Sequence, residues 1–202
     1  IFLLAKLGLS ILPNYFQAAL ITIISKNLGL KNLRADFPFK FDKKYIDINF
    51  GLFDSDTSIF PFVIKNSGWE QYEAIKTAEL FKENKTYDLV DLGANQALFT
   101  VQLLKLINTS EDTKISISNV MLYEADSRLI PLMDKNLRSN LSSEININIQ
   151  NIAISLKKGE VELILEKENT ANNTLEPSAM ANATSDEIRV KIKSINAIEF
   201  EE

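Results

Sequence analysis

The chain has 202 residues, of which 46% are hydrophobic and 24% are charged, and its formal net charge is −5. This composition is typical of a globular α/β-sized domain and excludes disordered, collagen-like and mucin-like chains, while the mild acidity argues against a general nucleic-acid binder, which needs a basic face. The chain contains neither Cys nor His, which excludes disulfides, thiolate or imidazole metal sites, cysteine nucleophiles and Ser-His-Asp catalysis. Catalysis would have to use carboxylates, Lys, Arg, Tyr, backbone groups or a bound cofactor.

The first 30 residues form the most apolar part of the chain. Pro13 interrupts an uncharged run that would otherwise be long enough to span a membrane. The pattern favours two short helices, Phe2 to Ile11 and Tyr15 to Lys26, packed on the domain or on a partner, with membrane-surface attachment as the weaker alternative and a span as the weakest. We therefore expect a cytoplasmic protein whose peripheral membrane or partner contact, if it makes one, involves residues 1–30.

The segment from Asp36 to Lys65 changes to a period typical of strands. Apolar and polar residues alternate from Tyr45 to Phe50, and Ser58 to Ile64 is a further apolar run. This pattern predicts a β-hairpin or a small antiparallel cap. The Asp54–Asp56 segment resembles the start of a calcium loop, but the downstream Gly and Glu of such a loop are absent, so a turn is the better interpretation.

From Gly68 onwards, helix-period segments alternate with short apolar runs. Parallel strands joined by helices make right-handed crossovers, so we expect an open, twisted α/β sheet with helices on both faces. We divide the chain into a helical and β-hairpin cap at residues 1–66 and an α/β domain at residues 67–202. The expected helices are Glu70 to Lys82, Ala97 to Leu106 and Ser127 to Asn140, and the expected strands are Tyr87 to Leu92, Asn119 to Tyr123, Ile145 to Ile154, Glu160 to Leu165 and Ile188 to Ile192.

The sharpest feature is the segment from Tyr87 to Thr100, where an apolar strand ends at Asp91, turns over Gly93 and leads into a helix. Small residues let a ligand approach the backbone at the carboxyl end of a strand, and a helix N-terminus favours an anionic group there. Asp91 adds an acceptor for an ammonium group. A ligand that carries both a carboxylate and an ammonium suits this loop better than a pyrophosphate does.

Polar or small residues also follow the next two strands. Glu124 ends the second strand, where an acidic side chain can accept hydrogen bonds from a ribose diol. Gln150 to Ala153 ends the third strand, where small and amide residues could contact the edge of a purine ring. Each feature has a plainer interpretation: a strand-to-helix turn at Gly93, a solvated strand end at Glu124, and a strand cap at Asn151. Their occurrence in order at three successive strand ends favours a common ligand site.

The segment Asp91 to Thr100 resembles the first motif of the FkbM-type S-adenosylmethionine-dependent methyltransferases. The resemblance implies a Rossmann-like class I methyltransferase sheet at residues 67–202 and methyl transfer from S-adenosyl-L-methionine, usually to a hydroxyl of a sugar, glycan or small metabolite. It spans roughly Gly68 to Ile195 and continues in Gly68–Glu70, Tyr123–Asp126, Lys135–Asn140, Asn151–Ser155, Gly159–Leu163, Asn172–Leu175 and Val190–Ile195.

The resemblance also implies roles for individual residues. Asp91, Gly93 and Asn95 would hold the methionine end of the cofactor, and Glu124 would bind the ribose hydroxyls. Asn151 and Ala153 would lie near the adenine. The adjoining Ala94 and Ala125 complete the candidate cofactor-binding set, and no metal site is expected.

Two departures from the family pattern matter. Ala97 stands where the family usually has a second Gly, and its methyl group would narrow the approach to the backbone. The family's later Lys-Ile-Asp-x-Glu-Gly-x-Glu segment is absent, so we expect a domain incomplete at its C-terminus, in which the Leu89–Leu92 strand has an unpaired edge. No catalytic base can be named.

Two other functions stay open. A nicotinamide-dependent oxidoreductase would use the same sheet, but it expects Gly-x-Gly-x-x-Gly where this chain has Gly93, Asn95 and Leu98. A non-catalytic module could keep the fold and dock through its apolar N-terminus. Methyl transfer is the favoured interpretation, since it asks for positioning of an activated group and needs neither His nor Cys.

Overall fold

The structure is a computed structural model that describes residues 20, 23, 32–38, 45–53, 56, 59, 62–63, 68–109, 115–156, 158–166, 169–175 and 188–196. The expected helix Phe2 to Ile11 lies outside these residues, and of the helix Tyr15 to Lys26 only Leu20 and Ile23 are described, both of them helical. Within this part of the chain, no helix has the length and apolar character needed to cross a bilayer.

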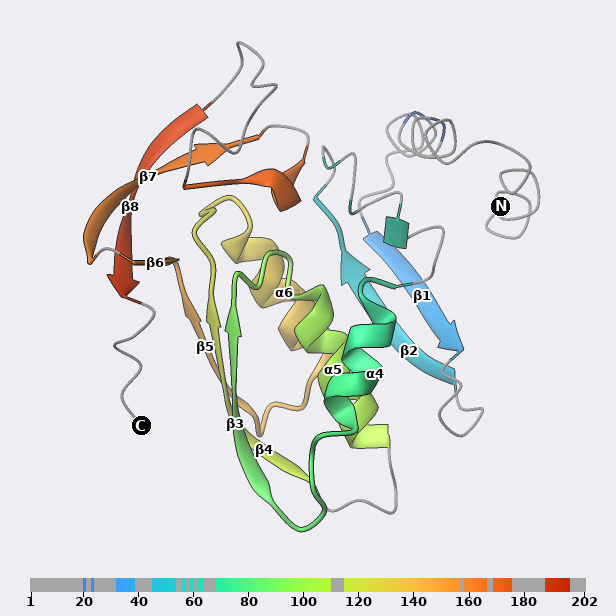
Figure 1. Ribbon diagram of the computed structural model, residues 1–202. Helices are drawn as coiled ribbons and strands as arrows, with labels where there is room; N and C mark the ends of the chain where they lie inside the picture. The colour runs from blue at the N-terminus through green and yellow to red at the C-terminus, as the bar shows by residue number, and fades with distance from the viewer. Residues whose placement is uncertain are drawn as a thin grey trace.

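The described elements form layers (Figure 1). A parallel sheet lies on one side, helices pack beside it, a hairpin covers the helices, and a second small sheet lies beyond the carboxyl ends of the first. In chain order the elements are β1 (Asn32–Pro38), β2 (Tyr45–Gly51), α4 (Gln71–Ala78), β3 (Thr86–Leu92), α5 (Leu98–Thr109), β4 (Ser116–Tyr123), α6 (Ile130–Asn140), β5 (Asn146–Gln150), β6 (Ala153–Ser155), β7 (Gly159–Leu165), a 3-10 turn (Thr170–Asn172) and β8 (Ile188–Asn196). The predicted alternation of helices and strands is confirmed.

The central sheet has the strand order β3-β4-β5, with all three strands parallel. Leu89 of β3 lies opposite Val120 of β4, which in turn lies opposite Ile147 of β5. Among the described strands β3 has a single neighbour, β4.

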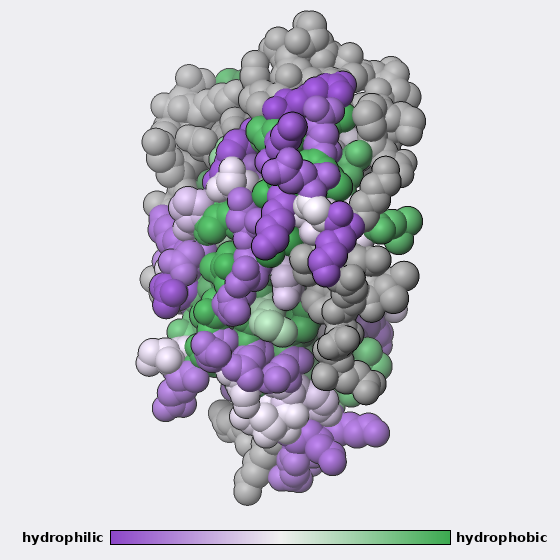
Figure 2. Space-filling view, turned by 90° about the vertical axis from the view of Figure 1, so that its left-hand side faces the viewer, coloured by the Kyte–Doolittle hydropathy of each residue, from purple (hydrophilic) through white to green (hydrophobic). Residues whose placement is uncertain are grey.

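The described helices α4, α5 and α6 lie on one side of this sheet (Figure 1), so the prediction of helices on both faces is wrong for this part of the chain. The strand order explains the difference. Right-handed crossovers that step in one direction place successive helices on the same face, and a helix reaches the other face only where the order reverses. Val90 and Leu92 are therefore 40% and 48% exposed, and apolar side chains gather on that open face (Figure 2).

The hairpin pairs β1 with β2 antiparallel, with Asp36 opposite Asp47. Its alternation buries Ile46, Ile48 and Phe50 against the helices, and these three belong to the same apolar cluster as the core residues of α5 and α6. The core is thus continuous across residue 66, where we divided the chain.

The predicted cap is correct as a hairpin, but the apolar run Ser58 to Ile64 is not one of its strands. The described residues of that run, Ile59, Phe62 and Val63, are helical. Ile59 and Val63, four positions apart, are buried on one side while Phe62 is exposed, which is the spacing of a helix face. Asp56 accepts the Ile59 N–H at 2.8 Å, and this matches the turn interpretation of the Asp54–Asp56 segment.

The expected third strand, Ile145 to Ile154, is two strands that belong to different sheets. β5 pairs with β4, whereas β6 pairs with β8 in parallel, and β8 pairs with β7 antiparallel. The break falls at Asn151, whose Nδ2 donates to the backbone oxygens of Glu124 at 2.9 Å and Ala125 at 3.0 Å. The bonds of Asn151 hold the start of the second sheet beside the carboxyl ends of β4 and β5.

Candidate functional site

Two adjoining pockets of about 400 and 440 Å³ lie at the carboxyl ends of β3 and β4. We call them the Asp91 pocket and the Glu124 pocket. Sizes in this range are typical of sites for small molecules and cofactors. Both pockets are lined by Leu92, Gly93, Asn95 and Ala171, so one elongated ligand could occupy both.

The loop between β3 and α5 separates the pockets and has an unusual backbone. Gly93, Asn95 and Ala97 all have positive φ, of 79°, 50° and 58°, a conformation that Gly adopts without cost, Asn tolerates and Ala disfavours. The loop is tied to the end of β4, because the Gly93 and Ala94 amides donate to the Tyr123 oxygen at 2.9 and 3.1 Å. These amides are therefore engaged, and an anionic ligand group would meet the first turn of α5 instead.

Ala97 does not narrow the site. It lines neither pocket, and its side chain is fully buried in the apolar cluster. The expectation that its methyl group restricts the approach to the backbone is wrong, since that methyl group packs in the core.

Asp91 is the last residue but one of β3 and lines the Asp91 pocket. Burial raises the pKa of Asp91 above its ordinary value, and a hydrogen bond from the Thr100 hydroxyl to Oδ2 offsets part of this rise. A half-buried carboxylate of this kind favours a positively charged partner, because a nearby cation stabilises its ionised form.

Glu124 directly follows β4 and is only 8% exposed. Its Oε2 accepts the Asn95 N–H at 2.8 Å and its Oε1 accepts the Asp126 N–H at 2.7 Å. Burial raises the pKa of Glu124, while these two bonds lower it in part. Each carboxylate oxygen keeps a further lone pair, so Glu124 can link the β3–α5 loop to the hydroxyls of a ligand.

A loop formed by residues 169–175 borders both pockets. The Thr170 hydroxyl donates to the buried Asp56, and Asn95 Nδ2 donates to the Thr170 oxygen at 3.2 Å. Asn173 Nδ2 donates to Asp126 Oδ2 at 2.8 Å. The loop is therefore fastened to the hairpin side, to the β3–α5 loop and to the end of β4.

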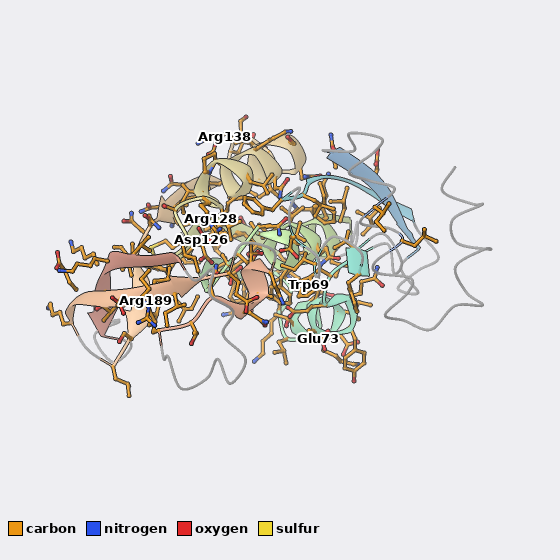
Figure 3. The ribbon with its side chains drawn as sticks, turned by 90° about the horizontal axis from the view of Figure 1, so that it is seen from above. Trp69, Glu73, Asp126, Arg128, Arg138 and Arg189 are labelled. Carbon is orange, nitrogen blue, oxygen red and sulfur yellow. The ribbon has the colours of Figure 1, made fainter. Side chains whose placement is uncertain are left out.

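The Asp126–Arg128 ion pair lies next to the loop of residues 169–175. Arg128 Nη2 lies 2.6 Å from Asp126 Oδ2, and the same nitrogen donates to the Glu166 oxygen at 3.0 Å. Asp126 and Arg128 lie side by side near the second sheet (Figure 3). Because the Asp126 side chain is fully buried, the pair fixes the segment that leads into residues 169–175.

The structure brings together seven of the eight predicted site residues. Asp91 and Ala94 line the Asp91 pocket, Glu124, Ala125 and Ala153 line the Glu124 pocket, and Gly93 and Asn95 line both. Asn151 lines neither, and its bonds to Glu124 and Ala125 agree with the plainer interpretation of a strand cap.

Trp69, Glu70, Thr170 and Ala171 are among the lining residues that the sequence did not predict as site residues. Trp69 and Glu70 line the Asp91 pocket, Thr170 lines the Glu124 pocket, and Ala171 lines both. The only signal for the last two is the Asn- and Thr-rich composition around residues 169–175.

The described chain is an α/β protein with a parallel three-stranded sheet, compatible with a Rossmann-like core, and its pockets lie at the carboxyl end of that sheet. No protein-family model matches the chain, and no curated protein matches it significantly.

Proposed function

We propose that this chain binds S-adenosyl-L-methionine and serves as a methyltransferase that acts on a hydroxyl of a sugar, glycan or small metabolite. One observation carries the proposal: two pockets meet at the Gly93–Asn95 loop, and each contains a carboxylate whose pKa is raised by burial, the half-buried Asp91 in one and the buried Glu124 in the other. This arrangement suits an elongated ligand with a cationic group at one end and a diol in the middle.

The residues present fit the cofactor at its amino-acid end. Asp91 can accept from the α-ammonium group, and the first turn of α5, where Leu98 and Phe99 line the same pocket, favours the α-carboxylate. The pocket thus offers opposite charge preferences to the two groups of an amino acid.

The residues also fit the adenosine end. Glu124 can accept from both ribose hydroxyls while keeping its backbone bonds. Ala125, Ile152 and Ala153 offer the Glu124 pocket small and apolar surfaces, which suit the flat face of a purine.

When bound, the cofactor supplies a methyl group activated by a sulfonium. The contribution of the chain is then to bind, orient and exclude water, and positioning of this kind accounts for a large part of catalysis in group transfer. The loop of residues 169–175, through Ala171 at both pockets, is placed to restrict the access of water.

The same pockets suit a dinucleotide poorly. Pyrophosphate binding relies on free loop amides, whereas the Gly93, Ala94 and Asn95 amides are already bonded within the protein. The carboxylates of Asp91 and Glu124 nearby would also repel a pyrophosphate. These points favour the methyltransferase proposal over a nicotinamide-dependent oxidoreductase.

Calorimetric titration tests the proposal. The wild-type chain should bind S-adenosylhomocysteine saturably and NADH not at all. Glu124→Ala should weaken S-adenosylhomocysteine binding at least tenfold, because it removes the diol acceptor and frees the Asn95 amide. Glu160→Ala is the matched control, since Glu160 is an exposed carboxylate on β7 outside both pockets, and it should leave the affinity unchanged. Binding of NADH, or equal effects of the two variants, would refute the proposal.

A further inference from the structure

Glu70 stands out among the residues that line the Asp91 pocket. It directly precedes α4 and adopts a left-handed backbone, with φ 49° and ψ 44°. This conformation is unfavourable for a non-glycine residue and persists only where the surroundings impose it, which is common at ligand sites. The structure thus holds a carboxylate at the pocket at a cost in backbone energy.

The constraint on Glu70 comes from its neighbour Trp69. The fully buried Gln102 of α5 accepts the Trp69 N–H on Oε1 at 3.0 Å and donates from Nε2 to the Trp69 oxygen. The Trp69 ring also packs edge-on against Phe62, with 5.2 Å between the ring centres. Trp69 lies two residues before α4, and Glu73 lies in the first turn of that helix (Figure 3). The backbone that enters Glu70 is therefore fixed by α5, the same helix whose first turn borders the pocket.

The position of Glu70 gives the Asp91 pocket a second carboxylate. Glu70 is exposed, and the partial desolvation of its carboxyl is the main cause of its raised pKa. The charges of Glu73 and Asp91 raise the pKa further, while a hydrogen bond with the Trp69 side chain opposes the rise. None of the described residues that line this pocket is Lys or Arg. The pocket is therefore negative without an internal counterion, and a ligand of net positive charge relieves the repulsion.

We propose that Glu70 is a specificity residue through which the chain binds S-adenosylmethionine in preference to S-adenosylhomocysteine, an inference that rests on the proposed function. The two molecules share the ammonium, the carboxylate and the adenosine. They differ in the sulfur, which is a cationic sulfonium in the first and a neutral thioether in the second. Asp91 would bind the ammonium group, which both molecules carry. Glu70 is therefore the carboxylate that would respond to the sulfonium charge, which only S-adenosylmethionine carries.

This preference would help turnover. Methyl transfer breaks the S–CH₃ bond and forms an O–CH₃ bond, the sulfur keeps the electron pair and becomes neutral, and the hydroxyl proton passes to solvent. The attraction of Glu70 for the ligand falls at that step, which favours exchange of the product for new cofactor. Glu70 is thus a residue that adjusts ligand affinity, and no proton transfer is assigned to it.

Titration calorimetry with both ligands tests the inference. The wild-type chain should bind S-adenosylmethionine about fivefold to tenfold more tightly than S-adenosylhomocysteine, the size expected for one added charge near a carboxylate at the protein surface. Glu70→Gln keeps the side-chain shape and should weaken S-adenosylmethionine binding about fivefold while changing S-adenosylhomocysteine binding less than about twofold. Glu73→Gln removes an equal charge one turn further along, outside the pocket, and should leave both affinities within about twofold.

Ionic strength gives a second readout, because Glu70 is an exposed residue. The preference of the wild-type chain should shrink as salt rises from about 0.05 to 0.5 M, and that of Glu70→Gln should change little. Equal weakening of both ligands by Glu70→Gln, or no change in either, would overturn the inference and leave the proposed function standing. If the wild-type chain binds neither ligand, the proposed function fails and the inference fails with it.

Discussion

Asn136 gives the sharpest test of how the hairpin, the helices and the candidate site are joined. Its side chain is fully buried on α6. Oδ1 accepts the Gly51 N–H at 2.6 Å, and Nδ2 donates to the Gly51 oxygen at 3.0 Å and to the Gln96 oxygen at 2.8 Å. One amide thus satisfies the end of β2 and the β3–α5 loop together, so Asn136→Ala should loosen both.

The expected magnitude follows from these three bonds. Each is worth about 1 kcal/mol net, and a buried partner left unsatisfied costs about 1–3 kcal/mol, so Asn136→Ala should reduce the free energy of unfolding by about 3 kcal/mol or more. With a urea dependence of about 2 kcal/mol per molar, the midpoint of urea unfolding should fall by about 1.5 M. Far-ultraviolet circular dichroism at equilibrium measures this directly.

Asn140→Ala is the matched control. Asn140 lies one turn further along α6 and makes the same kind of bonds to the hairpin, with the Asn49 N–H at 2.9 Å and the Asn49 oxygen at 2.8 Å, but these bonds are exposed. Water replaces them in the variant, so the loss should stay below about 1 kcal/mol. Equal losses for the two variants, or a loss below about 1 kcal/mol for Asn136→Ala, would refute the assigned role of Asn136.

Two further predictions concern β3. Asp91→Asn should raise the free energy of unfolding at pH 7 and weaken S-adenosylhomocysteine binding. Because the pKa of Asp91 is raised in the folded chain, the contribution of Asp91 to stability is present below its ordinary pKa of about 4 and is lost as pH rises through the folded-state pKa. The neutral amide of the variant does not ionise and so avoids that loss. Urea unfolding at pH 7 and near pH 3 checks this, and a gain of equal size at both pH values would contradict it. Val90→Lys, on the open face where Val90 is 40% exposed, should reduce concentration-dependent light scattering and change stability by less than about 0.5 kcal/mol; unchanged scattering would show that this face does not drive association.

Much of the fold could be predicted because local periodicity carries it. The alternation from Tyr45 to Phe50 predicted β2, and the short apolar run before Gly93 predicted β3. The run Ser58 to Ile64 was misassigned because a short apolar run does not separate a strand from a helix, and the deciding contact is the cap that Asp56 provides for Ile59.

The one-sided helix layer could not be predicted, since strand order depends on long-range pairing. The pattern of alternating elements is the same whether the order continues as β3-β4-β5 or reverses, and a reversal is what places helices on the second face. The expected single strand Ile145 to Ile154 was divided for a similar reason, because the pairing of β6 with β8 is invisible in local sequence.

In the candidate site too, the residues set by local sequence could be predicted and those set by long-range contacts could not. Asp91, Gly93 and Glu124 could be predicted because they lie at or just after the ends of apolar strands, and the carboxyl ends of parallel strands meet at one edge of a sheet. Thr170 could not, because its bond to Asp56 spans 114 positions. Glu70 could not be assigned a role either, since its placement depends on the left-handed backbone and on the bonds between Trp69 and Gln102.

A crystal structure of the chain with S-adenosylhomocysteine tests the central claim most directly. The account predicts that the ligand spans both pockets, with the ribose hydroxyls within hydrogen-bond distance of the Glu124 carboxylate and the ammonium within hydrogen-bond distance of Asp91. A ligand bound elsewhere, or bound at these pockets without contact to either carboxylate, would contradict it.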